Sequence, residues 1–395
     1  MTQFIDFGHG GEGALSIGTS NLGGVGGFGI ARFSGTAGNN YGTIADVGYF
    51  NGTNGGRVND TCFIHQSQGA GAGQWELVKI INRVSTTIYF DRALTYTYIN
   101  PGAQILTAPN LYNGTITGTI STYTAWAGTA GGCIFLLDRG TLTINGTVAV
   151  NGTDGIKSSG TGNTSTTSGG GFRGGSGNSP GGSGSGTVNC GCGEGYNDST
   201  GLNNAGSTAA NENGGGGAYF NSGATNGVSG GGGGNGTAGG TATGIGGSTA
   251  GNDALTNMVF GGGGGGGGCN HVYQDRYSGG SGGGLILIIA NKLIVNNPIT
   301  VNGGNTVHNS GDTLHLGAGG GAGGSILIKA QEATLGTGLI TATGGTSVHG
   351  GAGGSGRIHL DYYSSYTGTT SPSLTATRTT ALANAGGGQF LTNFL

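Results

Sequence analysis

Residues 323–345 follow a sequence frame that returns elsewhere in the chain. The frame is a glycine pair, four mostly apolar residues, a polar corner, two short alternating segments and an Asn-Gly or Gly-Gly stop. Residues 131–152 and 283–304 repeat it, and a shortened copy begins at Gly354. Each copy is about 20 residues long and alternates with period two, which predicts strands of a solenoid coil. One copy cannot bury its apolar side alone, so we expect the copies to stack in parallel around a shared core.

The composition excludes several classes of protein. The chain has 100 Gly and only 5 Pro among its 395 residues, and charged residues make up 7%. Collagen is excluded because glycine does not recur at every third position and proline is scarce. The low charge also disagrees with ordinary disorder, which combines low hydrophobicity with high net charge. A formal net charge of −3 predicts no nucleic-acid partner, because phosphate binding requires a basic surface.

Cellular location is indicated by what the sequence contains and lacks. The longest apolar run, LILIIA at 285–290, is far shorter than the roughly 20 residues of a membrane span, so we expect no span. The first residues, MTQFIDFGHGGEG, show no basic segment followed by an apolar one, so we expect no secretory signal. The Gly/Asn/Ser/Thr-rich composition is nevertheless typical of proteins that work outside cells. A virion component satisfies both observations, which predicts a virion-surface or extracellular location.

We expect a β-rich cap before the first copy of the frame. Within it, residues 61–65 form a strand, and 75–81 pair with 85–90 as a hairpin with Asn82 and Arg83 near its turn. The cap covers the end of the solenoid, where the terminal rung otherwise presents unpaired backbone groups. The predicted parts are an attachment or oligomerisation segment (1–57), the cap (58–130), a first rung (131–153), a glycine-rich insertion (154–282), the remaining rungs (283–366) and a C-terminal tail (367–395).

Two interpretations of the glycine-rich insertion remain open. The first is a flexible linker, the usual role of Gly/Ser tracts. The second is a layer of ordered, extended threefold helices of the polyglycine II type, packed side by side. Ordering a residue costs about 1–2 kcal/mol, whereas a net hydrogen bond returns about 0.5–1.5 kcal/mol, so only a fully paired bundle breaks even. The insertion and the excursions at 317–324 and 350–354 all follow the stop of a copy. They are therefore expected on one side of the solenoid.

The frame resembles glycine-rich β-solenoid proteins of phage fibres and bacterial surfaces. The elements that carry this resemblance are the VNG stop at 301–303, GGSILIKA at 323–330, ITATG at 340–344 and GRIHLDY at 356–362. Residues 62–76, CFIHQSQGAGAGQWE, look like the module that precedes such solenoids. The polyglycine runs are similar to the tip domains of phage long-tail-fibre adhesins, in which packed polyglycine helices display receptor-binding loops. These resemblances imply a receptor-binding or structural role on a virion.

Aromatic residues set among the glycines are the candidate receptor-binding residues. Aromatic side chains suit sugar and protein recognition because they offer a large apolar area with few torsions to freeze. Two roles stay open for them: exposed contacts, or plugs that fill gaps against the solenoid. The candidates are Phe172, Tyr196, Tyr219, Phe220, Tyr273 and Tyr277.

Acidic residues give little indication of catalysis. Glycosidases need two carboxylates about 5–9.5 Å apart, and no obvious pair is present in the sequence. Asp138 and Glu332 fall at comparable corners of two copies, where we interpret them as solvated. Asp312, near His308 and His315, is the most suggestive cluster for a hydrolytic or metal site.

Cysteines and asparagines have simpler interpretations. Cys190, Cys192, Cys269 and His271 are of types that suit zinc, but the C-x-C spacing is tighter than usual, so a metal site, a disulfide and plain packing all remain open. Most Asn-x-Ser/Thr triplets read Asn-Gly-Thr, which is a turn former rather than a glycan site. The asparagines concerned include Asn113, Asn145, Asn151 and Asn235.

The sequence therefore predicts an all-β protein: a short parallel β-solenoid, or β-helix, with a β-rich N-terminal cap and an ordered polyglycine II-like layer. We expect a non-enzymatic tail fibre, spike or decoration protein of a virion, with no cofactor or metal. Expected partners are its own copies, other virion proteins, and a host-surface receptor that is a glycan or an outer-surface protein. The alternatives are a subunit of a cell-surface filament or sheath, and a tailspike-type polysaccharide depolymerase.

Overall fold

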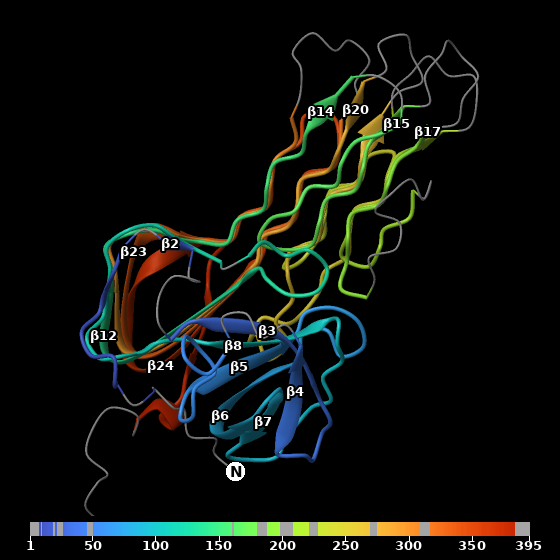
Figure 1. Cartoon of the computed structure of the whole chain (residues 1–395). Helices are drawn as coiled ribbons and strands as arrows, with labels where there is room; N and C mark the ends of the chain where they lie inside the picture. The colour runs from blue at the N-terminus through green and yellow to red at the C-terminus, as the bar shows by residue number, and fades with distance from the viewer. Residues whose placement is uncertain are drawn as a thin grey trace, which may run out of the picture.

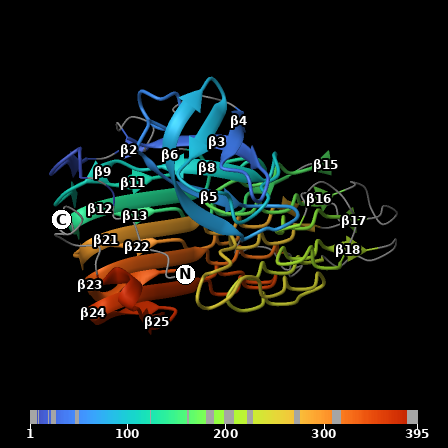
Figure 2. The ribbon, with the colours of Figure 1, turned by 90° about the horizontal axis from the view of Figure 1, so that it is seen from below.

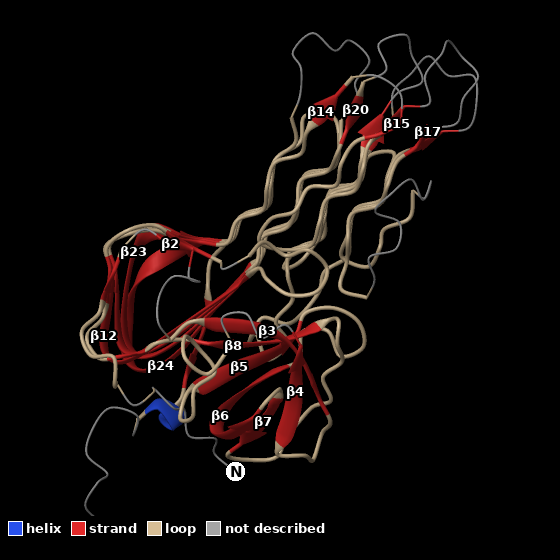
Figure 3. Ribbon diagram, viewed as in Figure 1, coloured by secondary structure: helices blue, strands red, loops and turns tan. Residues whose placement is uncertain are grey.

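The chain folds into an all-β structure, as expected. The computed structural model describes residues 8, 10–18, 20–21, 27–45, 50–122, 124–159, 162–179, 188–197, 208–220, 228–268, 275–307 and 317–383. Within these residues the one helical element is a 3₁₀ turn, η2 (Thr380–Leu382). Figure 3 shows a curled sheet, a barrel, and a third region that is almost entirely loop.

The copies of the sequence frame form the centre of a twelve-stranded sheet. Cys133 pairs with Leu285, Leu285 with Ser325, and Ser325 with Arg357, always in parallel. The expectation of parallel, in-register stacking is therefore confirmed (Figure 2). The four central strands are β12 (Cys133–Ile144), β21 (Leu285–Val295), β23 (Ser325–Thr341) and β24 (Arg357–Ser371).

The second part of each copy pairs in the same order. Val148 of β13 (Val148–Ala149) lies beside Ile299 of β22 (Ile299–Thr300), which lies beside Ile340 of β23. The sheet thereby curls into a half-barrel (Figure 1).

Short strands cover the first edge of the stack. They pair in parallel with β12 and β13, so the first copy does not present a bare backbone edge. These strands are β9 (Asn110–Leu111), β10 (Thr115–Ile116) and β11 (Ile120–Ser121), with β1 (Ser16–Ile17) and β2 (Ser20–Asn21) outside them. The last edge carries β25 (Thr375–Arg378), which pairs with β24 only from His359 to Tyr362.

The core of the curled sheet is a ladder of aliphatic side chains. Ile134, Ile286, Ile326 and Ile358 occupy one register position in the four copies, and all are buried. Fully burying such a side chain contributes about 1.5–3 kcal/mol. The stacking of identical positions therefore supplies the shared core that no single copy has.

The opposite face of the same strands changes character along the stack. Successive side chains of a strand point to opposite faces, so Leu137 and its register partners point away from the ladder. Those partners are Ile289, Lys329 and Asp361. At this register position the face is thus apolar in the first two copies and charged in the last two.

A closed antiparallel barrel precedes the stack, with the strand order β3-β4-β7-β6-β5-β8. Aromatic rings fill its interior: Phe33 packs edge-to-face on Phe90 and Tyr98, with centroids 5.9 and 5.8 Å apart. The predicted strand at 61–65 and the hairpin are present, but the turn lies at Ser85 and Thr86 because β6 extends through Arg83. The strands are β3 (Gly29–Gly35), β4 (Tyr41–Ala45), β5 (Thr61–Gln66), β6 (Trp75–Val84), β7 (Thr87–Phe90) and β8 (Ala103–Thr107).

The barrel packs sideways against the outward face of the stack. Phe63 of β5 contacts Phe135 of β12, with ring centroids 6.0 Å apart. Ile30, Phe63 and Leu106 of the barrel belong to the same buried cluster as the sheet core. This packing explains why the outward face is apolar in the first copies.

Glycine-rich segments run away from the sheet as a bundle of extended chains (Figure 1). The run 261–268 repeats its hydrogen bonds every three residues. Gly261 and Gly264 donate to Gly283 and Gly280, Gly262 and Gly265 to Gly234 and Gly231, and Gly263 and Gly266 to Glu194 and Gly191. Each run therefore bonds to three neighbours in turn. The later excursions join the same bundle, since Gly319 donates to Gly265 and Gly320 to Gly351.

Close approach of the chains requires glycine in this bundle. A Cβ atom on Gly264 would lie 1.9 Å from the carbonyl oxygen of Gly319. The glycines of the run 261–268 are buried, and six of them, Gly261 to Gly266, donate their amides to neighbouring chains, which does not fit a flexible linker for this run.

Small antiparallel pairs lie at the end of the bundle farthest from the sheet (Figures 1 and 2). These are β14 (Lys157–Ser158) and β19 (Gly267–Gly268) with β20 (Arg276–Tyr277), β15 (Gly162–Asn163) with β16 (Asn178–Ser179), and β17 (Val188–Asn189) with β18 (Tyr219–Phe220).

Candidate functional site

Two of the six candidate aromatics are buried plugs. Phe172 has no exposed surface and packs against Trp126 and Phe260, with centroids 6.1 and 5.4 Å away. Tyr277 is 1% exposed, and the Lys157 ammonium lies 5.6 Å from its ring centroid. Neither ring has surface with which to contact a receptor.

The other candidates differ in exposure. Tyr196 is half-buried, and its hydroxyl donates to Glu212 at 3.0 Å. Tyr219 is 37% exposed in β18, at the far end of the bundle. The side chain of Phe220 and the whole of Tyr273 lie outside the described residues. Of the four candidates whose side chains are described, Tyr219 is the exposed one.

Glu194 organises a buried polar junction that sequence reasoning missed. Its carboxylate, which has no exposed surface, pairs with Arg173 at 3.1 Å and accepts hydrogen bonds from Trp126 Nε1 at 3.1 Å and Gln68 Nε2 at 2.9 Å. Gln68 follows a barrel strand, whereas Arg173 and Glu194 belong to the glycine bundle. The junction therefore ties the barrel to the bundle.

Asp138 is not solvated, which corrects the prediction for this corner. Its side chain is fully buried and accepts backbone hydrogen bonds from Asn113, Gly114 and Gly140 at 3.1, 2.7 and 2.6 Å. Burial raises the pKa of Asp138, although these three bonds oppose the shift. The carboxylate replaces backbone partners where the strand turns its corner. Glu332 is exposed as expected and pairs with Lys292.

The predicted cysteine and histidine sites are only partly described. Cys190 and Cys192 are buried, and the Cys192 sulfur lies 3.5 Å from the Gly217 amide. Cys269 and His271 lie outside the described residues, as do Asp312, His308 and His315. Among the residues that are described, no three His, Cys, Asp or Glu side chains gather as metal ligands.

The asparagines of the Asn-Gly motifs form turns and ladders. The Asn151 side-chain oxygen accepts from the Asn302 amide at 2.8 Å, and the Asn302 oxygen accepts from Thr343 at 2.9 Å. Asn113 adopts a positive φ of 60°, and Asn235 is completely buried. These roles agree with the interpretation as turn formers.

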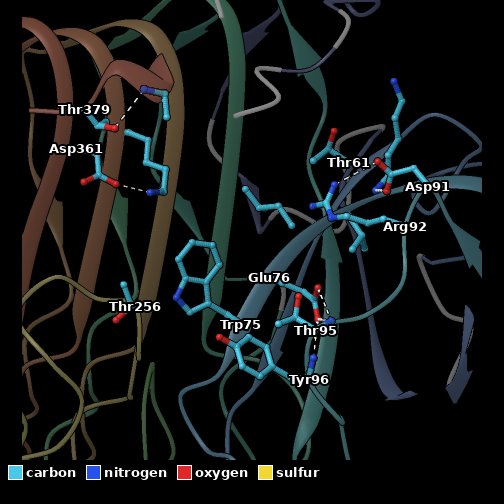
Figure 4. Close-up of a pocket in the computed structure, with 15 residues that line it drawn as sticks. Thr61, Trp75, Glu76, Asp91, Arg92, Thr95, Tyr96, Thr256, Asp361 and Thr379 are labelled. Carbon is cyan, nitrogen blue, oxygen red and sulfur yellow. Dashed lines mark hydrogen bonds and ion pairs between the residues drawn. The ribbon is translucent and has the colours of Figure 1, made fainter. Parts of the chain in front are cut away.

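A cleft of about 440 Å³ lies where the barrel meets the last copies of the sheet. Figure 4 shows the ring of Trp75 between the two walls, with Tyr96 next to it. Asp361 and Thr379 lie on one side, and Thr61, Asp91 and Arg92 on the other. The outward face of the stack contributes Lys329 and Asp361 to the lining of the cleft.

Trp75 is held in place by its surroundings. Its indole N–H donates to the Leu255 carbonyl at 2.8 Å, and its ring meets Phe63 edge-to-face at 5.8 Å. The Lys329 ammonium lies 5.8 Å from the ring centroid and forms an ion pair with Asp361. The ring is half-buried, so part of its face lines the cleft.

The carboxylates of the cleft all have partners. Glu76 accepts from the Thr95 and Tyr96 amides at 3.0 and 3.3 Å, and Asp91 accepts from the Lys79 amide at 2.8 Å. Burial disfavours the charge of Asp361, but the hydrogen bond from His359 and the Lys329 charge outweigh it, so the pKa of Asp361 lies below its ordinary value.

Asp361, His359 and Thr375 are of the residue types found in hydrolase triads. His359 Nε2 lies 3.2 Å from Asp361, and Nδ1 lies 2.7 Å from the Thr375 hydroxyl. However, Thr375 donates its single proton to the Asp253 carbonyl at 2.7 Å. Lys329 also neutralises Asp361. This arrangement therefore lacks an activated nucleophile.

Comparisons with known proteins give little further information. No family model matches the chain, and no curated protein sequence matches it. Among solved structures there is a weak similarity to the Gp54 tailspike of Acinetobacter baumannii bacteriophage AP22 in complex with A. baumannii capsular saccharide. It covers 93% of this chain at 9% identity, with a TM-score of 0.18, and the chain spans 62% of the tailspike. A TM-score of this size does not indicate a shared fold. None of the described helices is long and apolar enough to cross a membrane.

Proposed function

We propose that this protein is a non-enzymatic structural component of a virion surface, a tail fibre, spike or decoration protein that adheres to the host surface. The observation that carries the proposal is the glycine bundle. It extends from a stacked sheet and bears small antiparallel strand pairs at its far end (Figure 1). Such a bundle offers little side-chain surface of its own, so its use is to hold those strand pairs away from the sheet.

We infer that the glycine runs are polyglycine II helices and that the parallel stack is a short β-solenoid. Hydrogen bonds that repeat every three residues toward three neighbours support the first assignment. In-register parallel copies support the second. The threefold pairing matters energetically, because each net bond of about 0.5–1.5 kcal/mol must offset the entropy of an ordered glycine.

The far end of the bundle supplies the proposed adhesive surface. Ile156, beside β14, is 41% exposed, and Tyr219 of β18 is 37% exposed. Exposed apolar and aromatic groups of this kind are enriched at recognition surfaces.

Electron microscopy with an antibody against the barrel tests the location. We expect labelling of virion surfaces, and labelling of cell-surface filaments would contradict the proposal.

Adsorption of particles to host cells tests the adhesive end. The double variant Ile156→Ser with Tyr219→Ser should reduce adsorption, whereas Tyr112→Ser, at an exposed tyrosine near β9, should not. Release of reducing sugar from host polysaccharide by the purified protein would overturn the non-enzymatic assignment.

A filament subunit is the second candidate, because one observation favours it. No described strand pairs with the free edge of β24 beyond Tyr362, although β24 continues to Ser371. Such an edge is a template for pairing with another chain.

A further inference from the structure

We propose that the cleft between the barrel and the last sheet copies binds an uncharged oligosaccharide. This site lies beside the sheet and is separate from the antiparallel strand pairs at the far end of the glycine bundle. The inference goes beyond the proposed adhesion and does not require that end to be adhesive.

The shape and lining of the cleft fit a small ligand. Its volume of about 440 Å³ falls within the roughly 300–1,000 Å³ of small-molecule sites. The two walls come from independent parts of the fold: β6 and the segment after β7 on one side, and β23, β24 and the segment around η2 on the other. A ligand between them contacts both parts at once.

The outward face of β6 presents the apolar surface. Alternate residues Trp75, Leu77 and Lys79 point into the cleft, whereas Val78 and Ile80 fill the barrel. Tyr96 also lines the cleft and packs edge-to-face on Tyr98, with ring centroids 6.5 Å apart. The Trp75 ring, held by packing, offers a platform for the apolar face of a sugar ring, with few torsions to freeze.

The charges of the cleft argue for a neutral ligand. Arg92 pairs with Asp91 and Lys329 with Asp361, so the charged side chains at the cleft compensate one another except for Lys79. Glu76 lies on the other face of β6, where its carboxylate accepts from the Thr95 and Tyr96 amides. Asp91 and Asp361 would repel an anionic ligand. A cationic ligand would find both carboxylates already paired.

Polar groups without a described partner remain for hydroxyl groups of a ligand. Among the described residues, none forms a hydrogen bond with the Tyr96 hydroxyl or with the Lys79 ammonium. Thr95 also lines the walls. Neutral hydroxyls and aromatic rings together match the alternating polar and apolar surface of a saccharide.

Fluorescence titration provides the test, because the chain has only two tryptophans. Trp126 is completely buried, so a ligand-dependent change in emission reports on Trp75. The probes are four neutral trisaccharides, cellotriose, maltotriose, xylotriose and triacetylchitotriose. Deacetylated chitotriose and trigalacturonate serve as cationic and anionic counterparts. We expect saturable binding of at least one neutral probe, at least ten-fold tighter than either charged one.

Variants locate the binding in the cleft. By calorimetry, Trp75→Ala should weaken the affinity at least ten-fold. Tyr96→Phe, which removes one hydroxyl and leaves the ring, should weaken it about three- to ten-fold. Tyr112→Phe is the matched control and should not change it. Trp75→Ala also removes packing against Phe63, so its affinity counts only if circular dichroism shows that this variant is natively folded. If the variant is not folded, Tyr96→Phe alone provides the test.

The proposal is overturned if no neutral probe binds at 10 mM, if a charged probe binds most tightly, or if folded Tyr96→Phe and Trp75→Ala retain full affinity. These results leave the adhesion proposal untouched, since adsorption is tested at Ile156 and Tyr219. Conversely, normal adsorption of the distal double variant would contradict adhesion at that end without affecting the saccharide titration.

Discussion

Buried polar side chains join the barrel to the rest of the molecule. The Met258 carbonyl can only accept, so His65 Nε2 donates to it at 2.8 Å, and Nδ1 accepts from the Ser67 hydroxyl, also at 2.8 Å. The ring is fully buried and stacks against Phe63. The neutral ring thus satisfies both nitrogens, and a second proton would have no acceptor matched to it.

Burial lowers the pKa of His65 to about 4, from an ordinary value of 6.5. The unfolded chain therefore binds more protons between these values, so this residue makes the unfolding free energy rise with pH from 4 to 6.5. The loss at pH 4 should be about 3 kcal/mol relative to neutral pH. Denaturant titrations at pH 4 to 8 check this. The difference between wild type and His65→Gln isolates the contribution, and parallel curves would contradict it.

Glu194 allows a second prediction at this scale. Removing one partner of a buried ion pair costs about 3–5 kcal/mol, so Glu194→Ala should lower the unfolding free energy by about that amount. Glu332→Ala is the matched control, because Glu332 pairs with Lys292 on the surface. Its cost should be below about 1 kcal/mol. If both variants lost the same unfolding free energy, the buried junction would contribute no more to stability than a surface ion pair.

Single residues were also the hardest to predict. Glu194 carries no local signal, because its partners Gln68 and Trp126 are distant in sequence. Asp138 was interpreted as exposed because a polar corner is usually solvated. The Asp138 carboxylate is buried because it accepts hydrogen bonds from three backbone amides that need an acceptor.

At the scale of elements, the sequence predicted the strands of the stack and their register. The sequences of the four copies also differ in a way that indicates which of them are covered on both faces. RIHLD alternates in polarity and SILIK has a polar residue at each end, whereas CIFLL and LILII are apolar throughout. A strand without alternation is buried on both faces. The first two copies are indeed covered by the barrel, and the last two expose charges beside the cleft.

The glycine bundle gives a prediction for this scale. Gly264→Ala places a Cβ where the Gly319 carbonyl oxygen lies, so the chains must separate and lose paired hydrogen bonds. We expect a destabilisation of more than about 3 kcal/mol, together with faster amide exchange throughout the bundle. Gly18→Ala is the control, because among the described residues, its chain neighbours aside, no atom lies within 4 Å of the added Cβ. Unchanged exchange in Gly264→Ala would refute the tight packing.

At the scale of the whole molecule, contacts between segments that are distant in sequence could not be predicted from the sequence. β3 and β4 close the barrel with strands up to Thr107, and nothing in residues 29–45 specifies those partners. The cleft combines Trp75 and Tyr96 with Asp361, which meet only after both the barrel and the stack have formed. The stack could be predicted because every copy repeats the same sequence pattern.

The free edge of β24 allows a last prediction about assembly. An unpaired parallel edge exposes backbone donors and acceptors, so we expect purified chains to self-associate through residues 364–371. Lysine on an edge opposes such pairing, because a second chain would bring like charges together. Thr367→Lys should therefore shift sedimentation toward the monomer, and Val348→Lys, at another exposed site, should not. A monomer at every concentration, or an unchanged distribution in Thr367→Lys, would place the assembly contact elsewhere.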